Sequence, residues 1–260
     1  MQLQGKVALV TGASRGLGRI MALALADDGA DVICAARTTE DSPSKLPGTI
    51  DRTAAEVRER GRRSLALPMN LVDEVQVSDA VERALGEFGR VDILVNNAGV
   101  SFRGSVLEQG LARWDLVLGV NLRGAVQLCM LLAPGMVERG EGRIINISSG
   151  YASTPGTGRV SYATSKAALN KFTEGFAGEM RGKGVAVNCI ELELGLATEG
   201  FRFVNPDVDT SSWPDPEIMG DAAVWLARQP LDYTGNVLRI ADIRTALERV
   251  HRGEPAREAG

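Results

Sequence analysis

An apolar run near the start of the chain leads directly into a glycine-rich turn. Val7–Val10 is followed by Thr11–Gly18, with the sequence TGASRGLG, and then by an amphipathic pattern. Gly12 permits a tight turn, Gly16 lets a pyrophosphate approach the backbone, and Gly18 lets the following helix pack on the sheet. The helix N-terminus adds unpaired N–H groups and the positive end of its dipole. This order predicts a dinucleotide-binding unit, in which further cofactor contacts come from Ser14, Arg15 and Leu17.

Short β-branched runs alternate with amphipathic stretches along the whole chain. The runs are apolar on both faces, which is typical of a parallel sheet covered by helices on each side. We therefore predict one doubly wound α/β domain over residues 1–251, followed by a polar tail at 252–260. The predicted strands are Val7–Val10, Asp31–Ala36, Ser64–Leu67, Ile93–Val95, Arg143–Ser148, Val185–Ile190 and Asn236–Ile240. The predicted helices span 16–28, 49–61, 73–88, 110–138, 160–183 and 215–229.

Two segments interrupt this alternation. Residues 38–51 contain two prolines and a glycine directly after the second strand, which predicts a long loop. Residues 201–215 are similarly irregular, and they are positioned to act as a lid over a pocket.

Composition and charge exclude several classes of protein. The net charge of −4 argues against a nucleic-acid partner. The three cysteines lie far apart, and the single histidine, His251, is near the C-terminus, so we expect no metal site and no thiol- or histidine-based catalysis. The apolar runs considered, such as Leu128–Ala133, are too short to cross a bilayer, and the N-terminus does not resemble a signal peptide. We therefore expect a soluble, cytoplasmic protein.

The end of the second predicted strand bears on the choice of dinucleotide. An acidic residue there would bind a ribose 2′-OH and repel a 2′-phosphate. This chain instead has Ala36 followed by Arg37, and Arg15 can reach the same region. Two guanidinium groups favour NADP(H), with NAD(H) as the alternative. In the competing interpretation Arg37 is an ordinary solvated charge whose field is weakened by Glu40 and Asp41.

A tyrosine and a lysine are spaced for proton transfer. Tyr162 and Lys166 lie four residues apart and hence on one helix face. An ammonium close to the phenol favours the phenolate and lowers a pKa that is ordinarily near 10. Ser149 ends the fifth strand, where open α/β sheets place their ligands, and can hydrogen-bond a substrate carbonyl. Asn121 is a polar residue within an apolar helical stretch.

Together these features resemble the short-chain dehydrogenase/reductase family over residues 5–242. The matching elements are TGASRGLG (11–18), NNAG (96–99), Asn121, Ser149 and YATSK (162–166). The resemblance implies a seven-stranded Rossmann sheet with helices on both faces. It also implies that Tyr162 transfers the proton, that Ser149 polarises the carbonyl, that Lys166 binds the nicotinamide ribose and lowers the Tyr162 pKa, and that Asn121 holds a relay water.

The same resemblance extends the predicted cofactor site and narrows the family. It adds cofactor contacts at Asn70, Leu71, Asn97, Ala98, Gly99 and Thr198, besides Tyr162 and Lys166. KLPGTI (45–50) and YTGNVLRIAD (233–242) resemble the hydroxysteroid dehydrogenase-like branch. Family members assemble as dimers or tetramers through the helices that here contain Asn121 and Tyr162.

The sequence departs from the family pattern after the sixth strand. The usual Pro-Gly is absent from Asn188–Gly195, where Glu191 and Glu193 stand near the expected nicotinamide position. Thr198 comes one residue later than usual, and Asp242-Ile243 replaces the usual Asp-Gly-Gly. These departures are the support for an alternative function.

The leading hypothesis is an NADP(H)-dependent oxidoreductase that interconverts a carbonyl and a secondary alcohol of a small molecule. The alternative is a catalytically silent dinucleotide-binding protein that acts as a redox sensor or scaffold. An apolar ketone or acyl compound would suit a set of pocket candidates: Phe102, Tyr151, Leu194, Phe201, Phe203 and Trp213.

Overall fold

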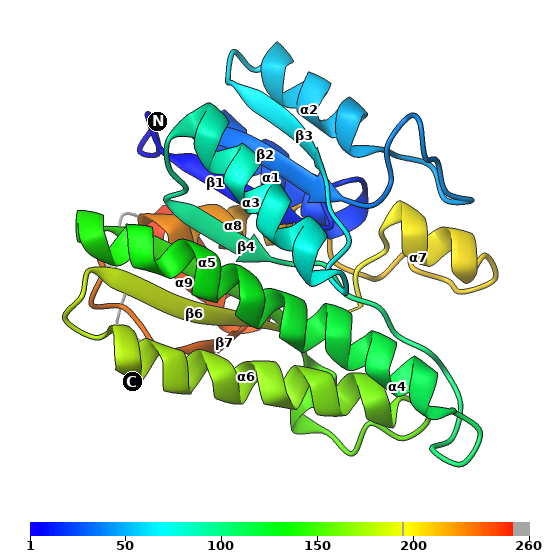
Figure 1. The fold of residues 1–260 in the computed structure, drawn as a ribbon. Helices are drawn as coiled ribbons and strands as arrows, with labels where there is room; N and C mark the ends of the chain where they lie inside the picture. The colour runs from blue at the N-terminus through cyan, green and yellow to red at the C-terminus, as the bar shows by residue number, and fades with distance from the viewer. Residues whose placement is uncertain (194, 252–260) are drawn as a thin grey trace.

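The computed structural model describes residues 1–193 and 195–251, and within them the chain forms one seven-stranded parallel sheet (Figure 1). Its order is β3-β2-β1-β4-β5-β6-β7, so the strand order reverses between β1 and β4. The strands are β1 Val7–Thr11, β2 Asp31–Ala36, β3 Ser64–Pro68, β4 Ile93–Asn96, β5 Gly142–Ser149, β6 Val185–Leu192 and β7 Val237–Arg239. The predicted doubly wound Rossmann sheet is confirmed, whereas residues 252–260, the predicted tail, lie outside the described residues.

Helices cover both faces of this sheet with two separate apolar cores. One core joins the sheet to α1, α2, α8 and α9, and the other joins it to α3, α5 and α6. The helices are α1 Gly16–Asp27, α2 Ile50–Glu59, α3 Glu74–Phe88, α4 Leu111–Leu118, α5 Gly124–Arg139, α6 Val160–Met180, α7 Glu199–Val204, α8 Ile218–Arg228 and α9 Ile240–His251. Most of these elements could be predicted because most of the strands are buried on both faces and the long helices have an apolar face.

Two helices were not predicted. The irregular segment 201–215 begins inside α7, whose N-terminus is capped by the Thr198 hydroxyl accepting from Phe201 N at 3.2 Å. The last strand ends early because the chain enters α9 at Ile240, where the Glu193 carboxylate accepts from the backbone N–H groups of Ile240 and Ala241, each at 3.0 Å. The prediction of a strand over 236–240 was therefore wrong at its C-terminal end.

The predicted helix 110–138 contains an irregular turn. α4 and α5 are joined by a π-helical turn, Gly119–Arg123, which holds Asn121. The helical run Leu111–Arg139 is long and apolar enough to cross a membrane, which the analysis of short apolar runs overlooked, but half of its most apolar window is buried inside the molecule. Such a helix is weak evidence of a membrane span, because core helices pass the same test.

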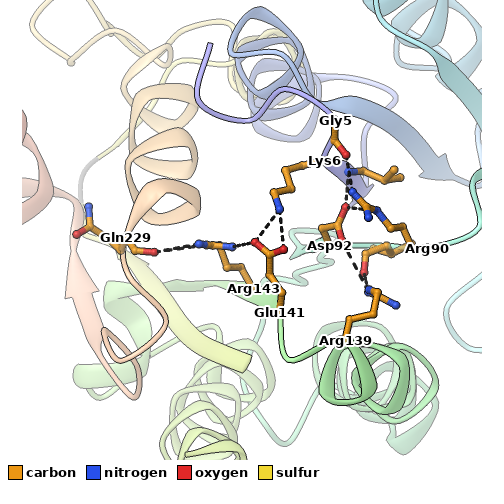
Figure 2. Close-up of polar contacts among 10 residues, drawn as sticks. Gly5, Lys6, Arg90, Asp92, Arg139, Glu141, Arg143 and Gln229 are labelled. Carbon is orange, nitrogen blue, oxygen red and sulfur yellow. Dashed lines mark hydrogen bonds and ion pairs between the residues drawn. The ribbon is translucent and has the colours of Figure 1, made fainter. Parts of the chain in front are cut away.

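A buried carboxylate ties three strands together at the edge of the sheet where the strands begin (Figure 2). Asp92 is 1% exposed, accepts from Val7 N at 2.9 Å and pairs with Arg90 at 3.0 Å. Its backbone also bonds to Val7 O and Arg143 N. Beside it, Lys6 donates to Glu141 at 2.7 Å in a more exposed pair.

Asp92→Ala is expected to lower the free energy of unfolding by about 3 kcal/mol, because it leaves the buried N–H of Val7 without its acceptor and removes the ion pair of Asp92 with Arg90. Urea denaturation measures this loss. Glu141→Ala, which removes an acid of the more exposed pair, is the control and is expected to cost below about 1 kcal/mol. Equal losses of unfolding free energy in the two variants would contradict the larger contribution of Asp92 to stability.

Candidate active site

The turn after β1 and the loop after β4 meet where the strand order reverses. The Thr11 hydroxyl accepts from the backbone N–H groups of Asn97 and Ala98, both at 3.0 Å, and donates to Val95 O at 3.2 Å. The Asn97 amide donates back to Thr11 O at 2.8 Å. These bonds fix the floor of a crevice at the carboxyl ends of the strands, the usual ligand position in this architecture.

Glycines are required here by space as well as by backbone angle. A Cβ on Gly18 would lie 2.2 Å from Gly12 O, and a Cβ on Gly12 would lie 2.8 Å from the Asn97 amide nitrogen. Gly12 and Gly16 have φ of +69° and +54°, values that favour glycine. The turn therefore presents bare backbone to the crevice, as close approach of a pyrophosphate requires.

The crevice opens into a cleft of about 470 Å³. Its volume suits a nucleotide, and most of the residues predicted to contact the cofactor line it. Those that line it are Gly12, Ser14, Arg15, Leu17, Gly18, Arg37, Asn70, Leu71, Asn97, Ala98, Gly99 and Thr198. Gly16, Tyr162 and Lys166, which were also predicted, do not form its lining.

A carboxylate from α7 lies against the glycine turn. The Glu199 carboxylate accepts a hydrogen bond from the backbone N–H of Gly16 at 3.0 Å. Gly16 is the first residue of α1. The Glu199 charge also acts on Arg15. Since helix N-terminal N–H groups are the ones that hold phosphates, Glu199 occupies a donor that a pyrophosphate would use.

The two arginines predicted to bind a 2′-phosphate have different surroundings. The Arg15 guanidinium donates to the carbonyl oxygens of Pro47, Leu46 and Gly48 at 2.8, 3.2 and 3.0 Å, and to the Ser44 hydroxyl. Most of its donors thus bind the predicted loop before α2, although Arg15 also lines the cleft. Arg37 is exposed at the end of β2 and lines the cleft.

The four predicted catalytic residues converge on the other side of the crevice. The Asn121 side chain, 2% exposed, accepts from Val100 N at 2.8 Å and donates to Val100 O and the Ser165 hydroxyl. The buried Lys166 ammonium donates to Ile147 O at 2.7 Å and lies 5.7 Å from the centroid of the Tyr162 ring. A Cβ on Gly99 would lie 3.5 Å from Asn121 Oδ1 and 3.7 Å from Lys166 Nζ, so the NNAG loop adjoins both.

Ser149 and Tyr162 interact directly, but the protonation of the tyrosine differs from expectation. Burial raises the pKa of the Tyr162 phenol, and the Ser149 hydroxyl and the Arg159 charge only partly oppose this. Burial also lowers the pKa of Lys166 to about 8. The predicted fall in the Tyr162 pKa is therefore wrong for these residues on their own, because the Lys166 ammonium is directed to Ile147 O.

Comparison with known proteins decides the family. Residues 6–207 match the family model described as short chain dehydrogenase. The chain belongs to the short-chain dehydrogenase family. This membership and the NADP complex of a solved relative support a NAD(P)-dependent oxidoreductase.

Relatives agree with this assignment. The dehydrogenase is 35% identical over 244 residues to hydroxysteroid dehydrogenase-like protein 2 of Danio rerio, covering 93% of this chain and 58% of that protein. The chain thus spans little more than half the length of the curated relatives it matches. The names of these relatives confirm the predicted hydroxysteroid dehydrogenase-like branch.

Solved structures give the same fold. A short chain dehydrogenase of Mycobacterium thermoresistibile superposes with a TM-score of 0.85 at 33% identity, covering 94% of this chain and 87% of that one. A metagenomic short-chain oxidoreductase in complex with NADP has a TM-score of 0.77 at 29% identity, covering 92% and 98%.

The acidic departures from the family pattern do not face the cleft. Glu191 is buried and accepts from the Ser153 hydroxyl at 2.9 Å and from the Asn170 amide at 2.9 Å, which links β6 to the 3₁₀ turn after Ser149 and to α6. Glu193 caps α9. Both carboxylates therefore have structural partners of their own, and neither lines the cleft.

The apolar pocket candidates are only partly gathered. Phe201 lines the cleft and packs against Trp213 with centroids 4.8 Å apart, while Phe102 lies under the Arg113 guanidinium. Tyr151 and Phe203 are exposed. Leu194, a further candidate, lies outside the described residues.

Sequence reasoning missed Arg159, Glu199 and the partners of Glu191. Arg159 could have been predicted to lie near the site, because it stands three residues before Tyr162. Glu199 carried no local signal, because the residue that it contacts, Gly16, lies at the other end of the sequence.

Glu199→Ala is expected to tighten NADPH binding about fivefold, which corresponds to ~1 kcal/mol, because it frees Gly16 N and removes a negative charge beside the phosphates. Fluorescence titration with NADPH measures the dissociation constant. Glu82→Ala, which removes an exposed charge from α3, is expected to leave it unchanged. Weaker binding in the Glu199 variant would contradict competition for this donor.

Proposed function

We propose that the dehydrogenase reduces a carbonyl compound with NADPH and catalyses the reverse oxidation of the secondary alcohol. The observation that carries the proposal is the contact of the Ser149 hydroxyl with the Tyr162 phenol, beside the buried Lys166, at the edge of the dinucleotide cleft. The bare glycine turn and the nucleotide-sized cleft fit the dinucleotide. When bound, it supplies the hydride in one direction and accepts it in the other.

The chain's own residues manage the proton. Ser149 donates a hydrogen bond to the substrate carbonyl oxygen and polarises it. Tyr162 gives its phenolic proton to that oxygen as the alkoxide forms, and takes it back in the reverse reaction. The Lys166 ammonium stabilises the resulting phenolate, and Asn121 helps to hold the water through which the proton is replaced.

The proposed preference for NADP(H) over NAD(H) depends on Arg37. β2 ends at Ala36 without a carboxylate that would repel a 2′-phosphate, and Arg37 is exposed at that edge of the cleft. Arg15 contributes by holding the neighbouring loop, as its four bonds indicate.

The substrate is proposed to be a small molecule with an apolar body, for which Phe201 and Leu192 line the cleft. We further propose a cytoplasmic homodimer or homotetramer. Its assembly through α4, α5 and α6 is supported by the exposed apolar side chains of Leu111 and Met130, which are 79% and 71% exposed.

Tyr162→Phe is expected to lower kcat by about a thousandfold or more, because the proton donor is lost, while the NADPH dissociation constant changes little. Steady-state kinetics on a carbonyl compound that the wild-type enzyme reduces, together with an NADPH titration, give both values. Tyr233→Phe is the control, because Tyr233 packs on Trp225 rather than at the site. Full activity in the Tyr162 variant would remove this assignment.

Arg37→Asp is expected to weaken NADPH binding by at least about tenfold and to improve NADH binding. Parallel fluorescence titrations with the two cofactors measure the ratio. Lys45→Asp, the same change on an exposed lysine of the adjacent loop, is the control. An unchanged ratio would place the specificity at Arg15 or in the loop that it holds.

A further inference from the structure

An arginine at the start of α6 faces the reacting groups of the proposed site. Arg159 lies three residues before Tyr162, and its charge acts on the Tyr162 phenol. Its guanidinium carbon is also 5.9 Å from the ring centroid of Tyr151, and that ring meets the Tyr162 ring edge-on at 5.9 Å. Arg159 is therefore close to the position that a carbonyl takes when it contacts Ser149 and Tyr162.

The charge of Arg159 has no acidic partner within residues 1–193 and 195–251. Its polar contact is a hydrogen bond from Nη1 to the neutral Ser101 hydroxyl at 2.7 Å. A guanidinium carries about five N–H donors, so most of them remain available. By contrast, Arg228 pairs with the Asp28 carboxylate, and the half-buried Arg19 pairs with the Glu56 carboxylate.

Anchoring of the loop after β4 does not require Arg159. The backbone N–H of Gly104 donates to Gly158 O at 3.1 Å, and the Ser161 hydroxyl donates to the Gln109 side chain at 2.9 Å. These two bonds already connect the loop to the start of α6. The presence of an arginine without an acidic partner at this point is therefore better explained by binding of a ligand than by anchoring of the loop.

We propose that Arg159 binds a carboxylate of the substrate, so that the enzyme interconverts an oxo acid and the corresponding hydroxy acid. The inference rests on the proposed function, because it places the carboxylate relative to a carbonyl at Ser149 and Tyr162. The planar fork of a guanidinium matches a carboxylate, and a single cation suits a monoanion. Since Arg159 and Tyr162 are close neighbours, the acid group lies within a few bonds of the carbonyl, and the apolar remainder extends toward Phe201.

The test measures binding without turnover. Wild-type enzyme saturated with NADP⁺ is titrated by calorimetry with acetoacetate, with a longer β-oxo acid, and with the methyl ester of each. Because cofactor and ligand are both in the oxidised state, no hydride transfer occurs. Each acid is expected to bind at least about tenfold more tightly than its ester.

Variants test whether Arg159 is the group that causes the preference for the acid over its ester. Arg159→Gln is expected to abolish the preference for the acid and to leave ester binding within about twofold, whereas Arg159→Lys retains part of the preference because it keeps the charge. Arg113→Gln is the matched control, since that exposed guanidinium lies over the Phe102 ring at 5.6 Å. Equal binding of acid and ester to the wild-type enzyme, or an unchanged preference in Arg159→Gln, overturns the proposal.

The two proposals fail in different ways. If the wild-type enzyme binds NADP⁺ and, with NADPH, reduces the esters but does not favour the acids, the carboxylate proposal falls and the proposed function stands. If it binds no dinucleotide, the proposed function falls and the carboxylate proposal falls with it.

Discussion

The close approach of the β1 turn to the β4 loop is the constraint on which the rest of the site depends. Thr11 accepts two hydrogen bonds from Asn97 and one from Ala98 across the point where the strand order reverses. The approach leaves no room for a Cβ on Gly12 or Gly18. Because the NNAG loop also lies beside Asn121 and Lys166, these bonds connect the glycine turn to the predicted catalytic residues.

Burial determines the protonation of the reacting groups. The pKa of Tyr162 is raised by removal from water, so the phenol is protonated at neutral pH and suited to act as a proton donor. The pKa of Lys166 falls to about 8, which leaves the ammonium predominantly charged at pH 7. In the proposed reduction of a carbonyl, the Tyr162 phenolate would therefore form next to a cation, the Lys166 ammonium.

The fold was largely predictable because its evidence is local. Apolar runs identified the strands, and the glycine turn and the Tyr162–Lys166 spacing predicted the candidate site, whose residues the structure places around the cleft and next to it. The roles of Glu191, Glu193 and Glu199 were not predictable, since their partners lie far away in the sequence: Glu193 caps a helix that begins at Ile240, and Glu199 contacts Gly16. The sequence marked Glu191 and Glu193 as departures from a pattern, but only their hydrogen bonds show that they face away from the cleft.

The loop before α2 shows how a nonlocal contact alters an interpretation based on residue type. A Cβ on Gly48 would lie 2.4 Å from Ser14 O, and Gly48 has a φ of +98°, so this glycine allows the loop to pack on the phosphate-binding turn. The loop carbonyls then satisfy Arg15, which residue type alone assigned to a phosphate. The proposed recognition of a 2′-phosphate therefore places more weight on Arg37, which is exposed at the end of β2, than on Arg15, which holds the loop.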